Sequence, residues 1–177
     1  MKLNLGCGLD YREGWVNLDF NKGVKADIYH DLNKPLPFKE NEVDYILIDN
    51  IIEHLNIERV ISLIQELHSI CKNKAIIEIY APHYKGCYCF PILTHRSFFG
   101  IGKFDSYTIK GAKNSNERYG SARFKINEKL FFYQKEIPFP NWIFNFGRIW
   151  QRLMEKFQVF GFDEIQYKLE VVKEDRG

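Results

Sequence analysis

Four groups of residues that could bind a ligand each follow a predicted β-strand, at the point where the strand ends. The glycine turn Gly6-Cys7-Gly8 ends the first strand, and the acids that end the next three are Asp19, Asp31 and Asp49. In an open α/β sheet, ligands bind at the carboxyl ends of the strands. A glycine turn lets the backbone approach a ligand closely, and an acid at the next strand end can accept both hydroxyls of a ribose. The pattern predicts a nucleoside-binding cleft, and an α/β domain without a nucleotide is the alternative.

The elements that would position these residues can be recognised by their apolar patterns. Short apolar runs predict the strands 3–5, 15–19, 26–30, 43–48 and 75–80. Between the last two strands, Asn56 is a plausible N-cap for a helix on which Val60, Ile64 and Leu67 recur at helical spacing. Strands that alternate with helical segments indicate an α/β fold with a parallel sheet.

The ordered motifs of the first half of the chain resemble those of class I S-adenosylmethionine-dependent methyltransferases. The similar segments are Leu3-Asn4-Leu5-Gly6-Cys7-Gly8, Asn17-Leu18-Asp19, His30-Asp31-Leu32, Val43–Asp49 and Ile52-Glu53-His54-Leu55. The resemblance extends over roughly 2–84. We therefore expect a single domain over 1–177 with a three-layer Rossmann-like fold: a sheet that is parallel for five strands, antiparallel C-terminal strands and a shortened N-terminus.

The resemblance also implies the roles of the residues at the strand ends. Gly6, Cys7 and Gly8 would face the methionine moiety of S-adenosylmethionine, and Asp19 would bind the ribose. Asp31 and Leu32 would hold the adenine, and Asp49 or Asn50 would lie beneath the sulfonium. The same motifs say almost nothing about the methyl acceptor.

The connection after the glycine turn is unusual, because Leu9–Gly14 is short for a parallel crossover, which commonly takes about a dozen residues or more. Six extended residues still reach roughly 20 Å, enough to return along a short strand. We expect a loop without a helix, and a cleft that is open on this side or covered by the partner of a homodimer. The turn also lacks the G-x-G-x-x-G pattern with which NAD-binding proteins begin a helix at the pyrophosphate of the cofactor. Its absence argues against binding of a dinucleotide.

Three histidines are candidates for acid–base chemistry or acceptor binding. A base is needed only if the attacking atom must lose a proton, and His54 and His83 are the predicted catalytic residues. In the lid expected over 81–120, Tyr84, His95 and Arg96 are predicted to bind the acceptor. A structural hydrogen bond is the alternative role for each histidine.

A zinc site can be drawn from His83, Cys87, Cys89 and His95, since two thiolates and two imidazoles suit tetrahedral coordination. The Cys-x-Cys spacing is atypical of structural zinc, and the flanking Tyr88 and Phe90 suggest lid packing. We expect an aromatic lid and no metal.

A basic stretch could bind a phosphate or carboxylate of the acceptor, or an RNA backbone. It contains Lys110, Lys113, Arg118, Arg123 and Lys125, with Tyr107, Tyr119 and Phe124 as possible stacking partners. No nucleic-acid motif accompanies it, and a solvated loop is the usual explanation.

The segment 141–157 carries an apolar helical face, which suits the core, a dimer face or a membrane surface.

The composition of the chain excludes several other classes of protein. A chain of 177 residues with a net charge of +2 suits one globular domain and does not indicate a polyanion-binding protein. It shows no signal peptide, transmembrane segment or disulfide framework, so we expect a cytoplasmic protein.

The combined prediction is an S-adenosylmethionine-dependent methyltransferase that acts on an oxygen or nitrogen of a small-molecule or glycan-linked acceptor, with nucleic acid unfavoured as a partner. A non-catalytic S-adenosylmethionine-binding protein and an RNA-directed methyltransferase are the alternatives.

Overall fold

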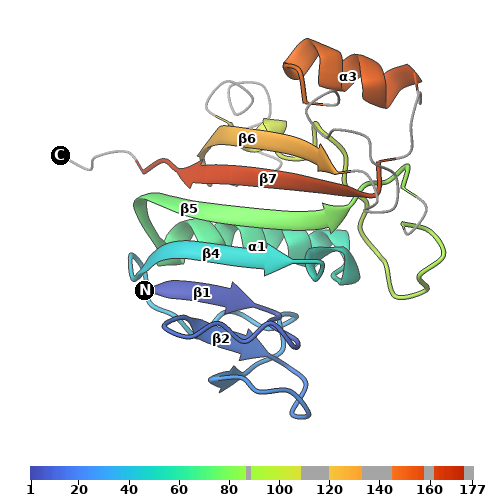
Figure 1. Ribbon diagram of the computed structural model, residues 1–177. Helices are drawn as coiled ribbons and strands as arrows, with labels where there is room; N and C mark the ends of the chain where they lie inside the picture. Colours follow the sequence, from blue (N-terminus) through green and yellow to red (C-terminus); the bar gives the residue numbers. More distant parts are fainter. Residues whose placement is uncertain (87–88, 109–119, 133–144, 158–161, 174–177) are drawn as a thin grey trace.

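The computed structural model describes residues 1–86, 89–108, 120–132, 145–157 and 162–173 (Figure 1). Its elements are β1 (Lys2–Leu5), β2 (Val16–Asp19), β3 (Ile28–Tyr29), β4 (Val43–Asp49), η1 (Ile52–His54), α1 (Ile57–Ile70), β5 (Cys71–Pro82), η2 (Asp105–Tyr107), β6 (Phe124–Phe132), α3 (Arg148–Phe157) and β7 (Glu164–Val171). Within the described residues, no helix has both the length and the apolar character needed to span a bilayer.

All seven described strands join one sheet in the order β3-β2-β1-β4-β5-β7-β6. The strands β1 to β5 run parallel, as expected, and β7 is antiparallel to both of its neighbours. It follows that β7 alone is reversed and that β6 runs in the direction of β5. Strand order reverses between β1 and β4, which is where open α/β sheets bind ligands.

One face of the sheet carries the main core. Leu3, Ile46, Ile77 and Leu169 lie in register across β1, β4, β5 and β7, and all are fully buried. The described helices pack on this side, because Leu63 of α1 and Met154 of α3 belong to the same buried cluster. Each such side chain contributes about 1.5–3 kcal/mol by leaving water.

The helix α1 begins and packs as its sequence predicts. The side chain of Asn56 caps it by accepting a hydrogen bond of 2.8 Å from the N–H of Arg59. Val60, Ile64 and Leu67 are buried against the sheet, and α1 lies behind β4 and β5 in Figure 1. The cap and these buried residues therefore fix the helix on the core face of the sheet.

The opposite face of the sheet carries a cluster of polar side chains, and no described helix covers it. Tyr45, Glu78, Tyr80 and Gln166 lie there and share hydrogen bonds. The reason is the length of the crossovers on this side: Gly6–Trp15 joins β1 to β2 with turns alone. The loop without a helix is confirmed, and the described helices form one of the two layers expected around the sheet.

Strand β6 runs continuously, with a register shift between Ile126 and Glu128. One C-terminal expectation needs correction. Only Arg148–Phe157 of the expected 141–157 helix is described as α3, and Ile149 is 79% exposed. The apolar face that contains Ile149 therefore points away from the core, to which α3 contributes Met154, and Trp142 lies outside the described residues.

The predicted lid is partly a packed segment. Phe99, Phe104 and Tyr107 are buried, and Phe104 packs edge-on against Tyr167 of β7 at 4.7 Å. Residues 109–119 of the expected lid lie outside the described residues. The described part rests on the core face of the sheet and brings residues 94–96 to the strand ends.

Candidate functional site

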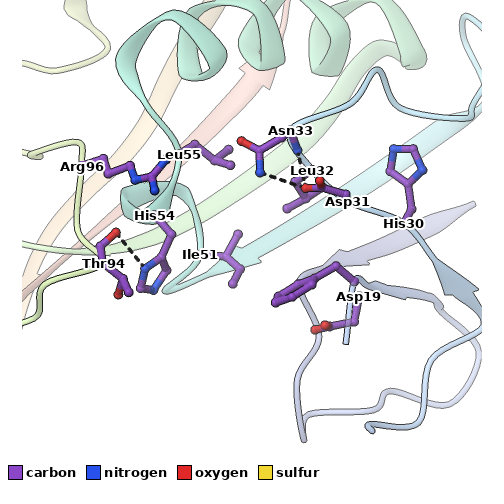
Figure 2. Close-up of a pocket in the computed structure, with 12 residues that line it drawn as sticks. Asp19, His30, Asp31, Leu32, Asn33, Ile51, His54, Leu55, Thr94 and Arg96 are labelled. Carbon is purple, nitrogen blue, oxygen red and sulfur yellow. Dashed lines mark hydrogen bonds between the residues drawn. The ribbon is translucent and has the colours of Figure 1, made fainter. Parts of the chain in front are cut away.

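A cavity of about 500 Å³ lies at the carboxyl ends of the first strands (Figure 2). Six of its lining residues were predicted from the sequence: Gly6, Asp19, Asp31, Leu32, His54 and Arg96. Six were not: Phe20, His30, Asn33, Ile51, Leu55 and Thr94. This volume falls within the range of small-molecule sites, about 300–1,000 Å³.

At Gly6, the first position of the glycine turn, the backbone has a conformation that only glycine accommodates. Gly6 has φ of +71°, and a Cβ on it would lie 2.2 Å from Cγ1 of Ile51. Its N–H donates to the carbonyl of Leu18 at 2.7 Å, which ties the turn to β2. The turn after β1 and the side chain of Ile51, two residues after β4, can thus approach each other at the cavity wall.

Asp19 is connected to the same turn. It is 5% exposed, and its Oδ2 accepts a hydrogen bond of 2.8 Å from the N–H of Gly8. Its Oδ1 accepts from the N–H of Asn21 at 2.8 Å. Each oxygen keeps a lone pair for a further donor, so the carboxylate can accept two hydroxyls without losing these contacts.

The segment after β3 forms another wall. Oδ1 of Asp31 accepts from both the backbone N–H and the side-chain amide of Asn33, each at 2.9 Å. The backbone hydrogen bond is the main reason that the pKa of Asp31 lies below its ordinary value. Arg59 of α1 fixes this segment, because its guanidinium donates to the carbonyls of Leu32 at 2.5 Å and of Lys34 at 2.8 Å.

The opposite end of the cavity is formed by η1 and the lid. Figure 2 shows His54, Thr94 and Arg96 together, with Ile51 between them and Asp19. Nδ1 of His54 lies 3.4 Å from the carbonyl of Thr94, and partial burial lowers the pKa of this imidazole. The exposed Arg96 side chain supplies a permanent cation at this end.

Behind His54 lies Glu53, which the sequence analysis did not single out although it belongs to the Ile52-Glu53-His54-Leu55 motif. Its side chain is 3% exposed, and burial raises its pKa to about 7. Oε1 lies 3.9 Å from Nε2 of His54 and 3.9 Å from Nε2 of His95. Only the folding of the lid onto η1 reveals this cluster.

Four predicted cofactor residues lie near the cavity without lining it. Cys7 is buried, which raises the pKa of its thiol, and Gly8 supports Asp19 from behind. Asp49 and Asn50 are exposed at the end of β4, and the amide of Asn50 donates to Asp49 and to Glu164. Ile51, the next residue, does line the cavity.

Three predicted acceptor-side residues also lie outside the lining. His83 is fully buried, with Nε2 at 3.0 Å from Oε1 of Glu155 in α3. Tyr84 joins the lid through its backbone N–H, which donates to Phe99 at 2.8 Å. His95 stands behind His54, with Nδ1 at 2.9 Å from the carbonyl of Cys89.

The described residues give little support to RNA or zinc as a ligand, the two alternatives considered from the sequence. Tyr107 and Phe124 are 6% and 1% exposed, so they cannot stack on a base. Lys110, Lys113, Arg118 and Tyr119 lie outside the described residues. The zinc set is divided, because His83 pairs with Glu155 while Cys87 is not described.

Comparison with known proteins gives matches at the level of structure. No protein-family model matches the chain, and no curated protein matches it in sequence. An S-adenosylmethionine-dependent methyltransferase from Archaeoglobus fulgidus superposes with a TM-score of 0.62 at 19% identity, covering 96% of this chain and 85% of that one. One from Mesorhizobium loti superposes with a TM-score of 0.54 at 12% identity, covering 96% and 90%.

The chain has the methyltransferase fold. The resemblance predicted from the motifs is therefore confirmed in the architecture. In this methyltransferase fold, the cavity occupies the carboxyl ends of the strands on both sides of the β1–β4 reversal.

Proposed function

We propose that this protein is an S-adenosylmethionine-dependent methyltransferase that binds its cofactor in the cavity described above. One observation carries the proposal: Gly6, Asp19 and Asp31, which lie at the carboxyl ends of three different strands, line the same cavity. Separate crevices would have argued against a shared adenosyl ligand. The two solved structures compared above are S-adenosylmethionine-dependent methyltransferases, which favours the same activity.

The cavity fits an adenosyl ligand by the chemistry of its walls. The Asp19 carboxylate would accept the two ribose hydroxyls, and the Gly6 backbone would lie against the amino-acid moiety. Asp31, Leu32 and the exposed ring of Phe20 would hold the adenine by hydrogen bonding and stacking.

The chain contributes mainly alignment and exclusion of water. When bound, S-adenosylmethionine would supply a methyl group that its sulfonium already activates, and the products would be the methylated acceptor, S-adenosylhomocysteine and a proton that passes to water. Because little further activation is needed, His54, Thr94 and Arg96 would act by orienting the acceptor. The acceptor would be an oxygen or nitrogen of a small molecule or glycan, and the cation of Arg96 favours one with a nearby anionic or oxygen-rich group.

His83 has a different proposed role from the one expected. Its full burial and its hydrogen bond to Glu155 favour positioning of the lid against α3 over proton transfer. A cytoplasmic location and a homodimer remain predictions from the sequence.

The function is tested in two steps. Calorimetry should show that S-adenosylmethionine and S-adenosylhomocysteine each bind one site per chain. Screening pooled small-molecule and glycan acceptors for S-adenosylhomocysteine release would then identify the acceptor. Absence of binding to either ligand would remove the proposal, and binding without turnover on any acceptor would favour the non-catalytic alternative.

A further inference from the structure

Glu53, His54 and His95 converge at the acceptor end of the cavity. One ligand atom from each residue lies within 4.8 Å of the other two. Oε1 of Glu53 lies 3.9 Å from both Nε2 atoms, and the two rings meet edge-on at 5.0 Å. These distances are too long for direct hydrogen bonds between the three groups.

The second nitrogen of each imidazole faces a main-chain carbonyl. Nδ1 of His95 lies 2.9 Å from the carbonyl of Cys89, and Nδ1 of His54 lies 3.4 Å from that of Thr94. A carbonyl can only accept, so in the neutral rings the proton sits on Nδ1 and the lone pair on Nε2. Backbone carbonyls orient metal-binding histidines in this same way. Both Nε2 lone pairs therefore face the Glu53 carboxylate.

Glu53 lacks a partner that would balance its burial. The residue is 2% exposed, and Oε2 has no hydrogen-bond partner in the part of the chain that the structure describes. Its ion-pair contacts among those residues are with His54 and His95, so neither Lys nor Arg neutralises it. An unpaired buried carboxylate is costly, and a bound cation would remove that cost.

The backbone holds the two ligand segments together. The carbonyl of Glu53 accepts from the N–H of Arg96 at 2.7 Å and from that of Ser97 at 3.0 Å. The hydroxyl of Ser97 donates to the carbonyl of Leu55 at 2.7 Å. His95 is thus fixed against η1 before any ligand binds.

We propose that Glu53, His54 and His95 bind a divalent transition-metal ion. Two imidazole nitrogens and one carboxylate favour Zn²⁺, Mn²⁺ or Co²⁺ over Mg²⁺ and Ca²⁺, which prefer all-oxygen sites. Ligand atoms that bind one tetrahedral ion at about 2.1 Å lie about 3.4 Å apart. Both separations of 3.9 Å between Glu53 and the imidazoles would therefore shorten when the ion binds. This set shares only His95 with the zinc site considered from the sequence.

Three protein ligands leave positions open on the ion, and His54 already lines the cavity. The role of those positions rests on the proposed function: they would take an oxygen of the acceptor. The ion would lower the pKa of a bound hydroxyl and hold it beside the methyl group, with the proton passing to water. The acceptor class is then a hydroxyl compound with a second oxygen that can chelate. As a ligand, His54 would not be the base.

Cobalt provides a direct test, because it reports its coordination by visible absorption. Metal-free protein titrated with Co²⁺ should bind one ion per chain, show d–d bands, and lose those bands when Zn²⁺ is added. Glu53→Gln and His95→Asn should each weaken Co²⁺ binding more than tenfold. His68→Asn is the matched control, because His68 lies on α1 and its Nε2 contacts the carbonyl of Val172, outside the cavity.

Thermal unfolding in the presence of Co²⁺ separates binding from misfolding. The ion should raise the Tm of the wild type and of His68→Asn, and should leave the Tm of Glu53→Gln unchanged. Equal Co²⁺ affinity in Glu53→Gln and wild type would overturn the site and mean an adventitious ion only. So would the absence of d–d bands in the folded wild type.

The two proposals fail independently. Calorimetry with S-adenosylmethionine is run on the metal-free protein and on the Co²⁺-loaded protein. Cofactor binding without a Co²⁺ site overturns the metal proposal alone. A Co²⁺ site without cofactor binding supports the metal proposal and overturns the methyltransferase function.

Discussion

The main-chain N–H of Gly8 donates a hydrogen bond of 2.8 Å to Oδ2 of Asp19. The carboxylate at the end of β2 is therefore part of the glycine turn that ends β1. The contact leaves room on each carboxylate oxygen for another donor. The turn and the predicted ribose-binding acid form one preorganised wall of the cavity.

Asp19→Asn should weaken binding of S-adenosylmethionine by about tenfold or more, because a charge-assisted acceptor contributes about 1.5–3 kcal/mol. Calorimetry measures the change. Asp10→Asn is the matched control: Asp10 lies in the adjoining crossover, pairs with Arg12 and does not line the cavity. Equal affinity in Asp19→Asn and wild type would mean that the ribose lies elsewhere.

Gly6→Ala should lower the free energy of unfolding by about 3 kcal/mol, since a positive φ costs about 1–2 kcal/mol and the collision with Ile51 adds to it. Urea denaturation measures the change. Gly14→Ala separates the two causes, because Gly14 has φ of +76° and open space around it. Gly14→Ala should therefore lower the free energy of unfolding only by the cost of the positive φ. A coupling near zero between Gly6→Ala and Ile51→Ala would contradict the collision.

Phe20→Ala should weaken cofactor binding several-fold and leave stability nearly unchanged. Phe20 is 71% exposed yet lines the cavity, so its ring contributes little to the fold and is available for stacking on the adenine. Phe146→Ala is the control, because Phe146 is 77% exposed and does not line the cavity. Parallel calorimetry and denaturation distinguish the two variants, and a loss of stability in Phe20→Ala would argue for a structural ring.

The elements at the cavity were predictable because burial imposes simple patterns. The strand over 43–48 is a near-continuous apolar run, and Asn56 has the short acceptor side chain that favours a helix start. Asp19 and Asp31 follow such runs, so their positions at one sheet edge followed from the parallel topology. This reasoning located the glycine turn and both acids.

Contacts between distant segments could not be predicted in the same way. Arg59 reaches the carbonyl of Leu32 from a helix far along the chain, and no local pattern marks that pair. The convergence of Glu53 with His95 depends on how the lid folds back onto η1. Phe20 is a single exposed aromatic residue, which carries no periodic signal.

His83→Ala should reduce stability by about 3 kcal/mol, because it opens a cavity among aromatic rings and removes a partner of Glu155. His54→Ala is the comparison: His54 is partly exposed at the cavity and should change stability by less than about 1 kcal/mol. Urea denaturation measures both. Unchanged stability with lost turnover in His83→Ala would restore the catalytic role expected from the sequence.

The uncovered face of the sheet allows a pH prediction that centres on Glu78. Burial alone would raise its pKa, but hydrogen bonds from Tyr45, Tyr80 and Gln166 outweigh burial and place the pKa below its ordinary value of 4.5. A folded-state pKa below that of the unfolded chain means that ionised Glu78 stabilises the fold above about pH 4.5. This contribution is lost as the pH falls through the folded-state value.

The titration can be followed by carboxyl-carbon NMR, together with unfolding at pH 7 and pH 3. Tyr80→Phe removes a donor at 2.8 Å and should move the pKa of Glu78 back toward its ordinary value. Glu78→Gln should cost about 1 kcal/mol at pH 7 and less at pH 3, since pH 3 lies below the ordinary pKa of 4.5, where the stabilisation by the ionised carboxylate is smaller. A Glu78 that titrates at or above its ordinary value in the wild type would show that burial dominates and that these hydrogen bonds are not maintained in solution.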